Sequence, residues 1–97
     1  MDFTVEVRNT AIADLGKIVS YVAQDDPEAA RKLGYELLDT ALSLSKTPFK
    51  GSPYRRIAGI RKLTLRPYKI YYRLHETKTL VEVLRFWHSA RQEPDFK

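Results

Sequence analysis

Residues 9–30 read NTAIADLGKIVSYVAQDDPEAA, and this stretch decides the architecture that we expect for the chain. Its first part places apolar side chains every three or four positions, the spacing that lines one face of an α-helix. Asn9 and Thr10 are both candidate N-caps, and the apolar pattern lasts to about Gln24. The pattern predicts a helix that begins at one of these caps and ends near Gln24.

An acidic turn separates this helix from a second one. Asp26 can accept hydrogen bonds from free backbone amides, Pro27 suits the first helical position, and Glu28 favours the positive end of the helix dipole. Apolar residues then recur at helical spacing until Pro48, which disfavours helix in the residue before it. We expect the second helix to run to about Lys46 and to form a hairpin with the first.

Strands are predicted on both sides of the hairpin. Residues 3–8 alternate apolar and polar side chains, which is typical of a half-buried strand. After a loop at 51–53, three more strands are predicted at 60–66, 68–74 and 80–87. The expected fold class is α+β in the order β-α-α-β-β-β, with the helical hairpin packed on a mostly antiparallel sheet.

Length and composition restrict the class of protein. The chain has 97 residues, 43% of them hydrophobic and 30% charged, which predicts one globular domain over residues 1–97. No apolar run approaches the length of about 18 residues that a membrane span needs, and the chain has no secretory signal pattern. We therefore expect a cytoplasmic protein without membrane contact. The chain has no cysteine and only two histidines, so we expect no metal site and no cofactor.

The charge is divided unevenly along the chain. Residues 1–49 carry a net charge of −3, whereas residues 50–97 carry +8. A basic half of this kind attracts anionic partners such as RNA, DNA or an acidic protein segment. The simpler interpretation is a solvated basic surface.

The last two predicted strands are apolar on both faces. A helical hairpin can cover only one face of the sheet, so the other face would present aromatic and basic side chains to solvent or to a partner. The alternative is a small core that is packed on both sides. Strict alternation along residues 80–87 puts Leu84 and Phe86 on one face and Trp87 on the other.

Several short motifs occur in an order that is typical of one protein family. The first helix carries A-x-x-D-L-x-x-I-x-x-Y at residues 11–21, and the C-terminal half contains GIRKL at 59–63, YKIYYR at 68–73 and VLRFWHSAR at 83–91. With these motifs the chain resembles, over nearly its whole length, the ParE/RelE superfamily of toxins from bacterial type II toxin–antitoxin modules, also called plasmid stabilisation proteins. The fold that this resemblance implies is the one that periodicity predicts.

The resemblance implies a toxin that a cognate antitoxin neutralises, with operator DNA bound only through the antitoxin. ParE-like toxins inhibit DNA gyrase, and RelE-like toxins are ribosome-dependent mRNA endoribonucleases (mRNA interferases). A third reading is a decayed homologue that only binds its antitoxin. The long predicted helices favour the ParE branch, in which the chain itself breaks no bond.

A RelE-like activity would need specific side chains. Metal-free RNA cleavage requires a base, an acid and cations that stabilise the phosphate. The resemblance implies Arg61, Lys69, Arg85 and His88 as this catalytic set. The match is partial, because Leu63 stands where that branch has a lysine and no tyrosine follows the last strand. His88 could instead be a hydrogen-bonded residue that closes the sheet edge.

Two further sets of residues are candidate contacts. Basic positions that would contact gyrase, or else form surface ion pairs, are Arg61, Lys69, Arg73, Arg85 and Arg91. An acidic antitoxin segment that folds on binding would suit the basic half of the chain. Apolar residues of the second helix that could line its groove, or else widen the core, are Tyr35, Leu38 and Leu42.

Overall fold

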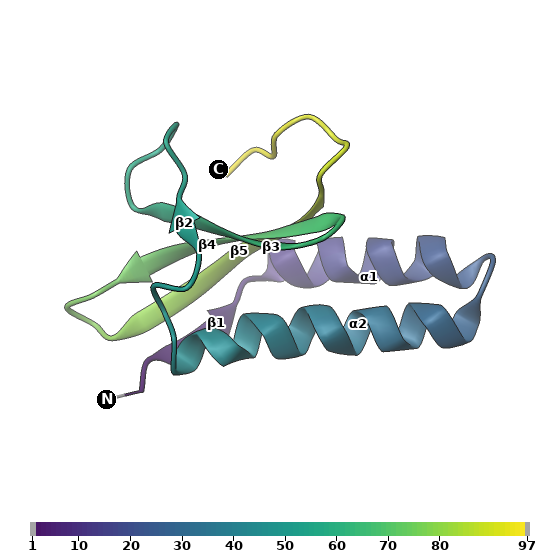
Figure 1. Cartoon of the computed structure of the whole chain (residues 1–97), viewed down its shortest axis with the longest axis horizontal. Helices are drawn as coiled ribbons and strands as arrows, with labels where there is room; N and C mark the ends of the chain where they lie inside the picture. The colour runs from purple at the N-terminus through teal and green to yellow at the C-terminus, as the bar shows by residue number, and fades with distance from the viewer. Residues whose placement is uncertain (1, 97) are drawn as a thin grey trace.

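Two antiparallel helices lie against one face of a five-stranded sheet (Figure 1). The computed structural model describes residues 2–96, so the two end residues of the predicted domain lie outside it. The elements in chain order are β1 (Thr4–Val7), α1 (Asn9–Ala23), α2 (Pro27–Leu42), a 3-10 turn (Ser43–Ser45), β2 (Ser52–Pro53), β3 (Ile60–Leu65), β4 (Tyr68–His75) and β5 (Leu80–His88). No helix within residues 2–96 has the length and apolar character needed to cross a membrane.

The sheet has the strand order β1-β5-β4-β3-β2, in which only the β1–β5 pair is parallel. The predicted α+β class and the mostly antiparallel sheet are therefore confirmed. The short strand β2 falls in the stretch that the sequence predicts as a loop, and it pairs with β3 through Ser52 and Pro53. β1 pairs with β5 only as far as Val83, and the chain then turns into α1.

The start of α1 differs from the sequence prediction. The helix begins at Asn9, its N-cap is Arg8, and no side chain caps it. The Thr10 hydroxyl instead donates a hydrogen bond to the Leu84 carbonyl of β5 at 3.0 Å. The predicted cap at Asn9 or Thr10 was wrong because the hydroxyl joins the helix to the strand, a tertiary contact that local sequence does not specify.

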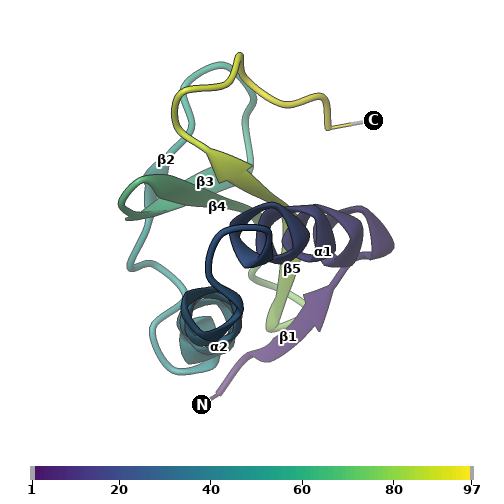
Figure 2. The ribbon, with the colours of Figure 1, turned by 90° about the vertical axis from the view of Figure 1, so that its right-hand side faces the viewer.

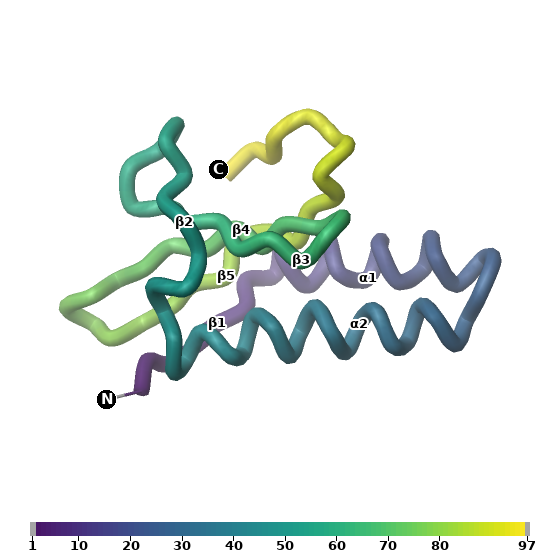
Figure 3. Tube along the Cα trace, in the orientation of Figure 1, coloured from purple at the N-terminus to yellow at the C-terminus, as the bar shows by residue number. Residues whose placement is uncertain are grey.

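The second helix begins as predicted and ends earlier. Asp26 Oδ1 accepts a hydrogen bond from the Ala29 amide at 3.1 Å, and Pro27 is the first helical residue. α2 ends at Leu42, where the 3-10 turn takes over. The turn end of the hairpin extends beyond the sheet (Figure 3).

The main core lies between the helical hairpin and the sheet. Its fully buried side chains include Leu37 and Leu44 from the helical segment and Ile70, Tyr72 and Phe86 from the strands. Burial of this apolar surface is the main source of stability for a domain of this size.

A β-bulge in β5 changes which side chains share a face. Tyr71 pairs with Arg85 and Tyr72 pairs with Val83, which leaves Leu84 as the extra residue. Phe86 therefore packs in the helix-side core, whereas Leu84 joins Trp87 on the opposite face. The strict alternation that placed Leu84 with Phe86 was wrong for this reason.

The face of the sheet away from the helices is also packed. Tyr54, Ile60, Tyr71, Leu84 and Trp87 form a second buried cluster there, with Phe96 against it. The segments that cover it are the loop between β2 and β3 and the tail after β5, both on the side away from the helices (Figures 1 and 2). The sequence left open whether the aromatic side chains of this face are exposed or packed, and in the structure they are packed.

Candidate functional site

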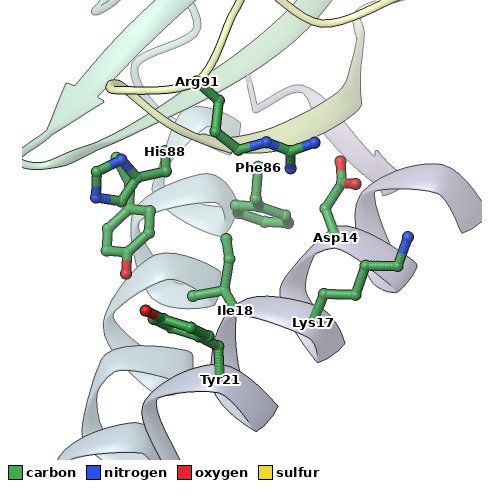
Figure 4. Close-up of a pocket in the computed structure, with 8 residues that line it drawn as sticks. Asp14, Lys17, Ile18, Tyr21, Phe86, His88 and Arg91 are labelled. Atoms are coloured by element: carbon green, nitrogen blue, oxygen red, sulfur yellow. The ribbon is translucent and has the colours of Figure 1, made fainter.

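A cavity of about 400 Å³ opens between α1 and the paired ends of β4 and β5 (Figure 4). Its floor is apolar and includes Ile18 and Phe86, and its rim carries Lys17, Arg91 and His88. Asp14, Tyr21 and Tyr68 complete the lining. An apolar hollow with a few convergent polar groups is the usual form of a binding site.

The tyrosines of the cavity bring hydroxyl groups close to its apolar floor. Burial raises the pKa of Tyr68 above 10.0, and the neighbouring Tyr21 raises it further. The Tyr68 hydroxyl therefore stays protonated at neutral pH and can donate a hydrogen bond to a ligand. The Tyr68 ring also meets the His88 ring edge to face, with 5.2 Å between centroids.

His88 has a defined place at the end of β5. Its Nδ1 accepts a hydrogen bond from the Ala90 amide at 3.0 Å, so in the neutral ring the proton is on Nε2. Next to it, the Ser89 amide donates to the Pro67 carbonyl at 2.8 Å and ties the end of β5 to the β3–β4 turn. His88 thus closes the sheet end, and Nε2 has no hydrogen-bond partner within residues 2–96.

Arg85 is engaged with α1. Its Nε and Nη2 donate to the two carboxylate oxygens of Asp14 at 2.6 and 2.9 Å, and its Nη1 donates to the Asp95 carbonyl at 2.8 Å. The hydrogen bond to Asp14 raises the pKa of Arg85. The guanidinium also lies 4.7 Å from the Trp87 ring centre. Arg85 therefore joins α1, β5 and the C-terminal tail.

Arg61 is engaged with the loop that precedes β2. Its Nε and Nη2 donate to the Gly51 carbonyl at 3.1 and 2.6 Å, and Nη2 also donates to the Phe49 carbonyl at 3.1 Å. The Gly51 amide in turn donates to the Tyr72 hydroxyl at 3.0 Å. Arg61 thus holds the chain where it crosses from the helices to the sheet.

The four candidate catalytic residues do not meet at one point. Arg61 stands opposite Tyr72 on β4, whereas His88 stands opposite Tyr68. Four residues of strand separate these positions, or about 13 Å. Lys69 points to the other face of β4 from Tyr68, and it is opposite Trp87.

The remaining candidate contacts lie in three places. Lys69 and Arg73 share the strand face away from the helices. Arg91 stacks at 4.0 Å over Trp87 and also lines the cavity. On α2, Tyr35 is 63% exposed and Leu42 is 45% exposed, while Leu38 is half-buried. The α2 residues do not line the cavity of Figure 4, which takes its helical residues from α1.

Sequence reasoning missed the α1 side of this site. One signal was present: Asp14 falls within the apolar stripe of α1, where an unpaired carboxylate would be costly, so a basic partner could have been expected. Lys17 and Tyr21 gave no such signal, because a lysine and a tyrosine on a helix are ordinary surface residues.

The fold defines a class of protein, because solved toxins share this architecture. The toxin–antitoxin complex RelBE2 from Mycobacterium tuberculosis contains a chain that matches with a TM-score of 0.72 and 28% identity, over 91% of this chain and 99% of the other. A chain of the chromosomal ParDE system from P. aeruginosa matches with a TM-score of 0.76 and 25% identity, over 89% and 95%. The chain is a ParE/RelE superfamily toxin.

Sequence comparison gives the family within that class. Residues 5–93 match the model of the ParE toxin of the type II toxin–antitoxin system parDE, and the chain belongs to this family. It is also 36% identical over 96 residues to Toxin RelE1 of Caulobacter vibrioides, which covers 95% of this chain and 99% of the relative. Because its relatives carry both RelE and ParE names, these similarities do not distinguish gyrase inhibition from RNA cleavage.

Proposed function

We propose that this chain is a type II toxin that inhibits DNA gyrase by binding, without breaking a bond itself. The observation that carries the proposal is the engagement of Arg61 and Arg85 in the fold. A ribonuclease needs cations that are free to stabilise the phosphate. Arg85 gives donors from all three of its guanidinium nitrogens to Asp14 and the tail, and Arg61 gives those of Nε and Nη2 to loop carbonyls.

A specific observation favours the RelE-like alternative as a second candidate. The Nε2 of His88 is free of hydrogen bonds within residues 2–96, and His88 shares its cavity with Lys17 and Arg91. An imidazole in a cavity with two cations could act as the acid or the base of a metal-free cleavage, and the cations could hold the phosphate. This arrangement would be an active site different from the one that the family resemblance implies.

We also propose that a cognate antitoxin neutralises the chain by docking in the cavity of Figure 4. The apolar floor suits an apolar side chain of a partner, and the cations Lys17 and Arg91 at the rim suit carboxylates beside it. The solved chains that this protein resembles come from toxin–antitoxin systems, which supports such a partner. Contacts at Tyr35, Leu38 and Leu42 stay a prediction.

Induced expression in a host without the antitoxin tests the target. Replication that stalls with a DNA-damage response, while transcript 5′ ends stay unchanged, is the expected result. Purified toxin should also inhibit supercoiling by gyrase. Cleavage of mRNA in phase with codons would overturn gyrase inhibition, and its loss in His88→Gln would support the cavity as the active site. Normal growth would leave only the decayed, antitoxin-binding reading.

A further inference from the structure

We infer that the sheet face away from the helices binds the phosphate backbone of duplex DNA through Lys62, Lys69 and Arg73. This inference goes beyond the proposed function, because it concerns a contact that the chain would make with or without gyrase. The sequence led us to expect DNA contact only through the antitoxin. The placement of these three cations is the reason to assign a contact to the toxin itself.

Strand register places the three cations side by side. Lys62 of β3 stands opposite Tyr71 of β4, and Lys69 and Arg73 are two residues to either side of Tyr71. Both are therefore diagonal neighbours of Lys62 on the same face, and such diagonal positions lie about 7–8 Å apart. The three cations thus surround Tyr71 on one face of the sheet.

These cations have no carboxylate partner among residues 2–96. The carboxylate nearest in register is Glu82, opposite Arg73, and it is bound by Arg8 at 3.3 Å and by His75 at 3.0 Å. On the neighbouring loop and tail, Arg56 pairs with Glu93 at 3.1 Å. The side chains of the three cations are half-buried, and no carboxylate within residues 2–96 neutralises their charges, so the exposed part of each can meet an anionic partner.

A hollow beside Lys62 extends the basic surface. It has a volume of about 570 Å³ between the β2–β3 loop and β3, and Arg55, Arg56 and Lys62 all line it. Glu93 also lines it, paired with Arg56. The net charge of this wall is positive, which concentrates anions at the strand face.

The aromatic side chains of this face argue for a duplex and against a single strand. Proteins that bind single-stranded RNA or DNA stack unpaired bases on exposed aromatic rings. Here Tyr71, Tyr54 and Trp87 are only 2%, 7% and 8% exposed, because the loop and the tail cover them. Charge without stacking is the pattern of contacts to a duplex backbone. Lys62, Lys69 and Arg73 do not line the cavity of Figure 4, so a partner in that cavity would not cover them.

The test measures binding of the full chain to a short random-sequence duplex by fluorescence anisotropy. Three phosphate contacts predict a slope of about −2.7 for log affinity against log salt, so binding should weaken about forty-fold between about 50 and 200 mM salt. The variant K62Q/K69Q/R73Q should lose most of this slope and bind at least about tenfold more weakly at low salt. Circular dichroism checks that the variant is folded.

A matched control removes the same charge elsewhere. R31Q/K32Q/K46Q takes three positive charges from α2 and the turn after it, and it should bind the duplex within about twofold of wild type. Equal losses in both variants would show that net charge alone drives binding and would overturn the inference. Tighter binding of the single strand of the duplex would instead indicate RNA-like recognition. Displacement of the duplex by an equimolar acidic peptide would indicate a protein partner and would also overturn it.

Discussion

The pair between Asp14 and Arg85 gives the sharpest test of the reasoning, because the choice between gyrase inhibition and RNA cleavage rests partly on it. Asp14→Asn keeps the volume of the side chain and removes its charge. The side chains of Arg85 and Asp14 are only 19% and 7% exposed, and two hydrogen bonds of 2.6 and 2.9 Å join them. The substitution leaves a largely buried guanidinium without its counter-charge.

The magnitude follows from this burial. Removing one partner of a fully buried pair costs about 3–5 kcal/mol, and since Arg85 keeps some contact with water we expect Asp14→Asn to lower the free energy of unfolding by about 2–4 kcal/mol. Urea unfolding followed by the fluorescence of Trp87, the one tryptophan, should show a midpoint lower by roughly 2 M with an unchanged slope. A double-mutant cycle with Arg85→Gln should give a coupling energy of about 1.5–3 kcal/mol.

The chain contains its own control. Arg31 and Glu28 form a pair at 2.9 Å on α2, but their side chains are 63% and 79% exposed. Glu28→Gln should therefore change the free energy of unfolding by no more than about 0.5 kcal/mol. If Asp14→Asn cost as little as Glu28→Gln, Arg85 would not be held by the fold, and it would be available again as a phosphate-binding residue of a RelE-like toxin.

Three further predictions follow from named contacts. Gly51→Ala should lower the free energy of unfolding by about 1–3 kcal/mol in urea, because a Cβ there would lie 2.6 Å from the Lys62 carbonyl oxygen; Gly16→Ala, in an open part of α1, should raise it by about 0.5–1 kcal/mol. Burial raises the pKa of Tyr71 above 10.0, so the folded chain holds this proton more tightly than the unfolded chain. The protonated Tyr71 hydroxyl therefore contributes its full stabilisation below pH 10.0, and this contribution is lost as pH rises through the pKa of the folded chain. The midpoint of urea unfolding should fall above pH 10.0, and it should fall less steeply in Tyr71→Phe. Lys17→Glu should weaken antitoxin binding at least about tenfold in calorimetry, because it puts a like charge where a carboxylate is expected; an unchanged affinity would place the antitoxin elsewhere.

Local patterns were enough to predict the two helices and four of the five strands of this fold. The spacing of apolar residues in α1 and α2 and the proline after Asp26 are properties of neighbours in the chain, so the helical hairpin could be predicted within a few residues. Alternation along residues 3–8 predicted the first strand for the same reason. The family motifs then pointed to the toxin superfamily, because they consist of the residues that make these elements pack.

Contacts between distant elements could not be derived in this way. The bulge at Leu84 depends on how β4 and β5 pair, and it places Phe86 and Leu84 on opposite faces of the sheet. The sheet face away from the helices is covered partly because Phe96 packs against Tyr54 and Tyr71, which are far from it in the sequence. Neither contact leaves a periodic trace in the sequence.

The sequence by itself determined the fold class, the basic C-terminal half and the toxin superfamily, since each depends on residue types and their local order. Only the tertiary structure decided what the basic residues do. Arg61 and Arg85 are held by the fold, whereas Lys62, Lys69 and Arg73 are free of carboxylates within residues 2–96. The physical reason is that the function of a charge depends on its neighbours in space, and folding brings Asp14 to Arg85 across 71 positions of the chain.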